Sequence, residues 1–131
     1  MSGPLAGVRI VDLTRVVMGP FATQILADLG ADVIKVEAPE GDVLRHIAPM
    51  RNAGMGHIFL HHNRNKRSIV LDLRKPAGRD ALLRLAEKAD ALVYNVRPQS
   101  MQRLRLSYED VAAVNPRIVY VGAYGYGERG R

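Results

Sequence analysis

A strand pattern, a helical pattern and a second strand pattern follow one another near the start of the chain. Residues 8–13 and 32–37 alternate in polarity and are rich in β-branched side chains, as strands are. The spacing between them suits a short helix, so the three segments predict a βαβ unit. Such a unit has parallel strands and a right-handed crossover, which restricts the fold more than any other feature of the sequence.

The helix of this unit is expected to begin at Pro20, because proline is favoured at the first helical position. Gly30 is a good C-terminal stop. Apolar side chains recur at helical spacing and define one face of the helix, namely Phe21, Ile25, Leu26 and Leu29.

The remaining segments continue the alternation of strands and helices. Strands are predicted within residues 63–73, at 90–94 and at 118–121. Helices are predicted from Pro76 to Ala89, over residues 100–106, and from a cap at Ser107 to Asn115. Residues 38–65 form a long segment rich in proline and glycine, with one helical turn near Phe59. The fold class predicted is α/β, with an open, mostly parallel, Rossmann-like sheet and helices on both faces.

Residues 63–73 place three cations in four positions directly before an apolar strand that we expect to be buried. Lys66 and Arg67 stand at the start of this strand and are expected to brace either the fold or a part of the protein beyond this chain. Arg74 follows its end. Because ligands of open α/β sheets bind beyond the carboxyl ends of the strands, Arg15, Arg74 with Lys75, and Arg97 would surround a bound anion there.

The composition excludes several classes of protein. At 131 residues the chain fits one domain, and the absence of cysteine excludes a disulfide scaffold, a Cys-ligated zinc site and a thiol nucleophile. No secretory signal or membrane-length apolar run is visible, so a cytoplasmic location is expected. The net charge of +6 favours an anionic partner. We favour a phosphate-bearing small molecule over nucleic acid, because no nucleic-acid-binding motif occurs, and no membrane partner is expected.

Three further motifs carry less weight. Residues 125–130 match G-x-G-x-x-G, but they follow the fifth strand rather than the first, so a turn near a ligand is expected rather than a dinucleotide site. His57 and His61 are spaced like metal ligands on a helix but have no third ligand, so no metal site is predicted. Asp12 is the candidate for a general base, although a structural hydrogen-bond acceptor is the expected role.

Segments along nearly the whole chain resemble the class III CoA-transferase family (CaiB/BaiF type), which includes formyl-CoA transferase, carnitine CoA-transferases and α-methylacyl-CoA racemases. The matching segments are residues 4–12, 19–22, 26–37, 41–42, 63–73 and 115–117. The resemblance implies a Rossmann-like CoA-binding domain in an interlocked homodimer. Family chains are several times longer, and their nucleophilic aspartate follows the glycine loop after the fifth strand. Residues 1–131 are therefore expected to be an N-terminal part, inactive alone, with the catalytic aspartate beyond Arg131.

The activity implied is the transfer of CoA between an acyl-CoA and a carboxylic acid through a covalent aspartyl intermediate, with no metal. The alternatives are a racemase-type isomerase of the same family and a non-catalytic CoA- or nucleotide-binding module. The long segment before Arg64, together with Asn95, favours a transferase over a racemase. The acyl donor and acceptor are not specified by these residues.

Positions that contact CoA in the family can be matched one by one. The matching residues are Arg15, Val17, Met18, Ala38, Leu71, Arg74, Asn95, Val96, Arg97, Arg103 and Leu104. Ala38 replaces an often basic residue, and Val96 and Gln99 replace an aromatic residue and a glycine, so a phosphate contact, ring stacking and a turn are expected to differ there. The arginines of the set would bind the phosphates of CoA through charge-assisted hydrogen bonds.

Overall fold

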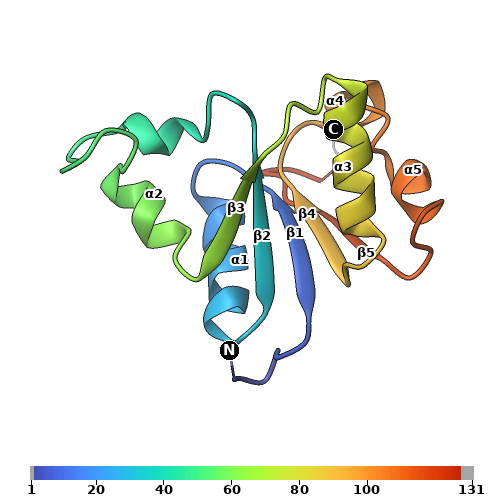
Figure 1. Cartoon of the computed structure of the whole chain (residues 1–131), viewed down its shortest axis with the longest axis horizontal. Coiled ribbons are helices and arrows are strands. Elements are labelled where there is room, and N and C mark those ends of the chain that lie inside the picture. Colours follow the sequence, from blue (N-terminus) through green and yellow to red (C-terminus); the bar gives the residue numbers. More distant parts are fainter. Residues whose placement is uncertain (1, 128–131) are drawn as a thin grey trace.

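Five parallel strands form one sheet in the computed structural model, which describes residues 2–127 (Figure 1). The strands are β1 (Arg9–Leu13), β2 (Asp32–Glu37), β3 (Lys66–Val70), β4 (Ala91–Tyr94) and β5 (Val119–Gly122). Their order across the sheet is β3-β2-β1-β4-β5, and each neighbouring pair is parallel. The predicted α/β class with a parallel sheet is confirmed.

Helices cover both faces of the sheet (Figure 1). α1 (Met18–Asp28) packs on one face, and α3 (Pro76–Ala86), α4 (Pro98–Arg103) and α5 (Tyr108–Ala112) pack on the other. Within the long segment 38–65, a 3-10 turn η1 (Val43–His46) and α2 (His57–His62) lie beyond the β3 edge, on the left of Figure 1. Among residues 2–127, no helix is long and apolar enough to span a membrane.

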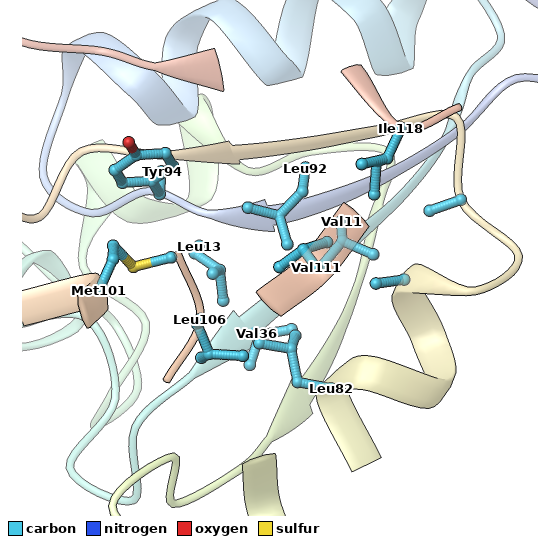
Figure 2. Packing of buried hydrophobic residues seen from close by; sticks show 12 residues of the cluster. Val11, Leu13, Val36, Leu82, Leu92, Tyr94, Met101, Leu106, Val111 and Ile118 are labelled. Carbon is cyan, nitrogen blue, oxygen red and sulfur yellow. The ribbon is translucent and has the colours of Figure 1, made fainter. Parts of the chain in front are cut away.

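The larger core lies between the sheet and the helices α3 to α5 (Figure 2). Val11, Leu82, Leu92, Leu106 and Val111 are completely buried in it. Fully burying an aliphatic side chain of this kind contributes on the order of 2 kcal/mol. This cluster holds twelve buried residues and the cluster under α1 holds five, so most of the apolar stabilisation comes from the α3 side.

The sheet face beneath α1 is partly polar. The Lys66 Nζ of β3 lies 2.9 Å from Asp12 Oδ2 and donates to the Thr23 hydroxyl of α1. On the same face, the Lys35 Nζ of β2 lies 3.1 Å from Asp42 Oδ2. Charges removed from water must be paired and hydrogen-bonded. That condition is met here, since no buried side-chain nitrogen or oxygen of the described residues lacks a partner.

The structure corrects the predicted bounds and the predicted face of α1. The helix begins at Met18, two residues before Pro20. Phe21, Ile25 and Leu29, which belong to the predicted apolar face, are 41–45% exposed. The residues that are buried instead are Gly19, Pro20, Thr23, Gln24 and Ala27. The polar side turns inward because Asp12 and Lys66, beneath the helix, require hydrogen-bond partners.

The structure also corrects the expectation that the strand after Arg64 is buried. β3 is an edge strand, and four of its five residues are exposed. The expected bracing roles are confirmed: the Lys66 ammonium is buried against Asp12, and Arg67 forms a bidentate pair with Asp32. Cations on an edge strand also discourage pairing with another chain.

Most other predicted elements agree with the structure within a few residues. The predicted turn near Phe59 is α2. The Ser107 cap is present, with a reciprocal capping box to Asp110. The helix after it ends at Ala112 rather than Asn115, whose side chain instead donates to the carbonyls of Ala86 and Ala89 at the end of α3.

Candidate functional site

The strand order changes direction between β1 and β4, and an open α/β sheet binds its ligand in the crevice at such a point. A cavity of about 460 Å³, the loop cavity, lies there. Residues 15–18, which follow β1, line it together with Asn95 and Arg97, which follow β4. The chain brings these segments together because β1 and β4 are paired neighbours in the sheet.

A second cavity of about 350 Å³, the central cavity, shares Arg15 with the loop cavity. Its lining is largely apolar where the ends of β2 and β3 face α4: Ala38, Leu71, Val96 and Leu104. Glu37 and Glu40 also line it. A flat or extended apolar group of a ligand would fit this part of the edge.

A third cavity of about 530 Å³, the arginine cavity, shares Leu73, Arg74 and Leu104 with the central cavity. Its cationic lining comes from the loop before α3, from α3 itself and from the end of α4: Arg74, Lys75, Arg79, Arg103 and Arg105. α3 begins beside it at Pro76, so the positive end of the helix dipole adds to this charge. The cavity is suited to an anion.

All of the predicted site residues line these three cavities. Arg15, Val17, Met18, Asn95 and Arg97 line the loop cavity. The other predicted residues line the central or arginine cavity, namely Ala38, Leu71, Arg74, Val96, Arg103 and Leu104.

Lys75, which was expected at a strand end, lines the arginine cavity. Other lining residues were not expected, among them Val16, Glu40, Arg79 and Arg105. Arg79 could have been found from the sequence, because it stands one helical turn after Lys75, where α3 begins. Arg105 could not, because its position depends on the left-handed turn (φ 54°) that ends α4.

The cations of the site differ in how far they are neutralised. Arg15, Arg97 and Arg103 are exposed and form no ion pair with another residue of the part described, 2–127. Arg74 is held by Asp72 (Nε–Oδ1 2.8 Å) and approaches Glu40. The hydrogen bond from Arg74 is the main cause of the lowered pKa of Asp72. A phosphate at Arg74 would compete with these carboxylates.

Three other motifs stand out in the sequence: Asp12, the histidines and the glycine pattern at 125–130. Asp12 is completely buried and accepts hydrogen bonds from Thr14, Thr23 and Lys66, so it acts as a structural acceptor. Within residues 2–127, no three His, Cys, Asp or Glu side chains are grouped as a metal site. Gly125 lines the loop cavity. Residues 128–130, the rest of the glycine pattern, lie outside the described residues.

The fold and the site together define a Rossmann-like α/β protein whose carboxyl edge carries adjoining apolar and cationic cavities. Residues 5–131 match the model of CoA-transferase family III, and the chain belongs to this family.

Relatives of known name support the family membership. The chain is 45% identical over 128 residues to the succinyl-CoA:glutarate CoA-transferase of Mus musculus, covering 97% of this chain and 29% of the relative. It is 43% identical over 129 residues to the acetyl-CoA:oxalate CoA-transferase of Acetobacter aceti, covering 98% of this chain and 33% of the relative. The chain thus spans about a third of the length of these relatives.

A solved structure shows the same fold. The crystal structure of a CaiB/BaiF family protein from Brucella suis superposes with a TM-score of 0.94 at 39% identity, covering all of this chain and 36% of that one. The five-stranded sheet is therefore similar to one part of a larger family fold.

Proposed function

We propose that the full-length protein is a CoA-transferase and that this chain supplies part of its CoA site. The transferase would move CoA from an acyl-CoA to a carboxylic acid. Family membership and the names of the two relatives support this class of reaction. Those names differ in the acid and agree on CoA, so the proposal concerns the class of reaction rather than one acid.

The observation that carries the proposal is the order of the cavities along the carboxyl edge. The central cavity, whose lining combines apolar side chains with Glu37 and Glu40, lies between two cavities that carry cations. These cations include Arg97 in the loop cavity and Arg103 and Arg105 in the arginine cavity. CoA has a matching arrangement, because its flat adenine ring is carried by a ribose that bears a phosphate group and a pyrophosphate. Arginine pairs with phosphate through strong, charge-assisted hydrogen bonds.

In the proposed reaction, an aspartate placed beyond Arg131 attacks the thioester carbonyl of the acyl-CoA. The C–S bond breaks, leaving an aspartyl–acyl anhydride and the CoA thiolate. The thiolate then attacks the aspartyl carbonyl of the anhydride, which releases the first carboxylate and forms an enzyme-bound CoA thioester. The incoming carboxylate attacks this thioester, which forms a second aspartyl–acyl anhydride and expels the CoA thiolate. The thiolate then attacks the acyl carbonyl of this anhydride, which gives the new acyl-CoA and frees the aspartate. The residues of this chain would hold CoA so that its thiolate stays near the aspartate.

The test is the affinity of the full-length protein for CoA, measured by calorimetry, in Arg97→Gln and Arg103→Gln variants. Removing one charge-assisted phosphate contact should weaken binding by about tenfold. Arg117→Gln is the matched control, because Arg117 is an exposed cation just before the amino end of β5. Its affinity for CoA should be unchanged.

Residues 1–131 alone are expected to bind CoA weakly and to have no transferase activity, and the functional unit is expected to be an interlocked cytoplasmic homodimer. Equal affinity in all three variants would contradict the proposed site. Tight, stoichiometric binding by this chain alone, without transferase activity at full length, would instead support a non-catalytic CoA-binding module.

A further inference from the structure

Between β1 and α1, residues 15–17 have exposed side chains but a fixed backbone. Side chains from elsewhere in the chain hold the polar backbone groups of residues 14–16. The Thr14 carbonyl accepts from Lys35 Nζ at 2.8 Å, and the Val16 N–H donates to Asp42 Oδ2 at 3.3 Å. Between them, Arg15 exchanges two hydrogen bonds with the Asn95 side chain, at 2.8 and 2.9 Å.

Two of these side chains form a buried ion pair. Lys35 and Asp42 are each 1% exposed, and their Nζ and Oδ2 atoms are 3.1 Å apart. Asp42 is itself held in place, because its Oδ1 accepts from the Leu44 N–H and its own N–H donates to Glu37. A buried pair of this kind contributes little to stability compared with apolar residues of the same size. Its contacts to residues 14–16 suggest another role.

The backbone at Val16 has a φ of 70°. This left-handed conformation is unfavourable for any residue with a Cβ atom and rare for a β-branched one. Such conformations persist only where the surroundings impose them. Here the surroundings are the hydrogen bonds to the turn, namely Val16 N–H to Asp42, Lys35 to the Thr14 carbonyl, and the two bonds between Arg15 and Asn95.

We propose that the Lys35–Asp42 pair positions the wall of the loop cavity. It holds residues 14–16 in the strained turn, and the turn aims the side chains of residues 15, 17 and 18 at the cavity. Lys35 and Asp42 are positioning residues, because the cavity is lined by the loop they hold and not by them. The inference rests on the proposed function, since it takes the loop cavity to receive part of CoA.

The first experiment changes only Val16, which is 47% exposed, so that the core stays intact. Val16→Pro removes the N–H that donates a hydrogen bond to Asp42, and the proline ring does not allow a positive φ. Val16→Ala is the matched control, because it shortens the same side chain and keeps the N–H. In the full-length protein, the proline variant should bind CoA about tenfold more weakly than the alanine variant, which is the effect of releasing one strained residue.

The second experiment separates positioning from folding. Asp42→Asn should raise the KM for the acyl-CoA while the KM for the carboxylic acid changes little. In this background, Val16→Gly should restore part of the affinity for CoA, because glycine adopts the left-handed turn without strain, and Val16→Ala should not. Asp32→Asn, which breaks the Arg9 and Arg67 pairs at the amino ends of the strands, should lower the melting temperature and leave the KM unchanged.

The outcomes distinguish this inference from the proposed function. If the wild-type protein does not bind CoA, both are overturned. If it binds CoA and folded Val16→Pro binds as tightly as Val16→Ala, only the positioning role is overturned. Equal rescue of Asp42→Asn by glycine and alanine would also overturn it. If Asp42→Asn does not fold, the comparison of Val16→Pro with Val16→Ala still tests the positioning role.

Discussion

Glu37 shows how a single residue connects the sheet to the site. It ends β2, is 4% exposed, and lines the central cavity. Burial alone would raise the pKa of Glu37. Hydrogen bonds from Arg45, Ser68 and the Asp42 N–H outweigh this effect and lower the pKa to about 2. The Arg45 guanidinium also lies 3.8 Å from the centre of the Phe59 ring, so one carboxylate ties β2, β3, η1 and α2 together.

This environment predicts a pH-dependent contribution to stability. Because the pKa of Glu37 is lower in the folded chain than its ordinary value of 4.5, the stabilisation is complete above pH 4.5 and is lost as the pH falls towards 2. The loss should be about 3 kcal/mol, from a difference of about 2.5 pKa units. Denaturant unfolding of the wild type and Glu37→Gln at several pH values measures it. Parallel stability curves for the two proteins would contradict the prediction.

At the scale of the element, α1 is the clearest case in which the tertiary environment overrides the sequence pattern. Its apolar stripe is partly exposed, and Thr23 lies fully buried over the polar end of β1. The Thr23 hydroxyl donates to Asp12 at 2.6 Å and accepts from Lys66 at 2.8 Å. The spacing of apolar residues alone cannot predict the buried face of a helix when that face must supply hydrogen bonds to buried charges.

Opposite results are therefore expected on the two faces of α1. Thr23→Val should destabilise the chain by about 1–3 kcal/mol, although valine is more apolar, because buried Asp12 and Lys66 each lose a partner. Ile25→Ser, on the 42% exposed face, should cost less than about 1 kcal/mol in this chain. The free energies of unfolding of both variants test this. A larger loss for Ile25→Ser would support the predicted apolar face instead.

For the whole molecule, the larger core and the cavities adjoin at Val36, Leu71, Val96 and Leu104, but the centre of the core lies away from the cavities. The larger core is under α3 to α5, whereas the cavities lie along the carboxyl edge of the sheet. Leu60 of α2 is an exposed apolar residue that belongs to neither the core nor the cavities. A core substitution should therefore change stability far more than a surface substitution of the same kind.

Leu82→Ala should lower the free energy of unfolding by about 2–5 kcal/mol, because Leu82 is completely buried and its removal leaves a cavity. Leu60→Ala, with Leu60 45% exposed, is the control and should cost less than about 1 kcal/mol. Thermal or denaturant unfolding measures both values. A similar loss of unfolding free energy in the two variants would contradict the position of Leu82 in the core.

The elements could be predicted from the sequence because they depend on short segments, whereas most of the candidate site residues were expected from the resemblance to the family. β2 is observed at the predicted residues, and the other strands differ mainly at their ends. The predicted site residues gather at one edge because the carboxyl ends of parallel strands meet there. Residues at the arginine cavity such as Arg105 were missed, because a left-handed turn decides where their side chains lie.

The sequence by itself determined the order of strands and helices, the parallel α/β class and the strand ends that carry cations, since periodicity and turn residues are local properties of the chain. Only the tertiary structure decided which face of α1 is buried and that β3 is an exposed edge strand. It alone joined Lys35 to Asp42 and held Val16 in a left-handed turn. The physical reason is that a buried charge must be paired, and its partner lies on a different strand or loop. Which segments lie close enough to pair depends on the folded structure and cannot be read from the order of residues.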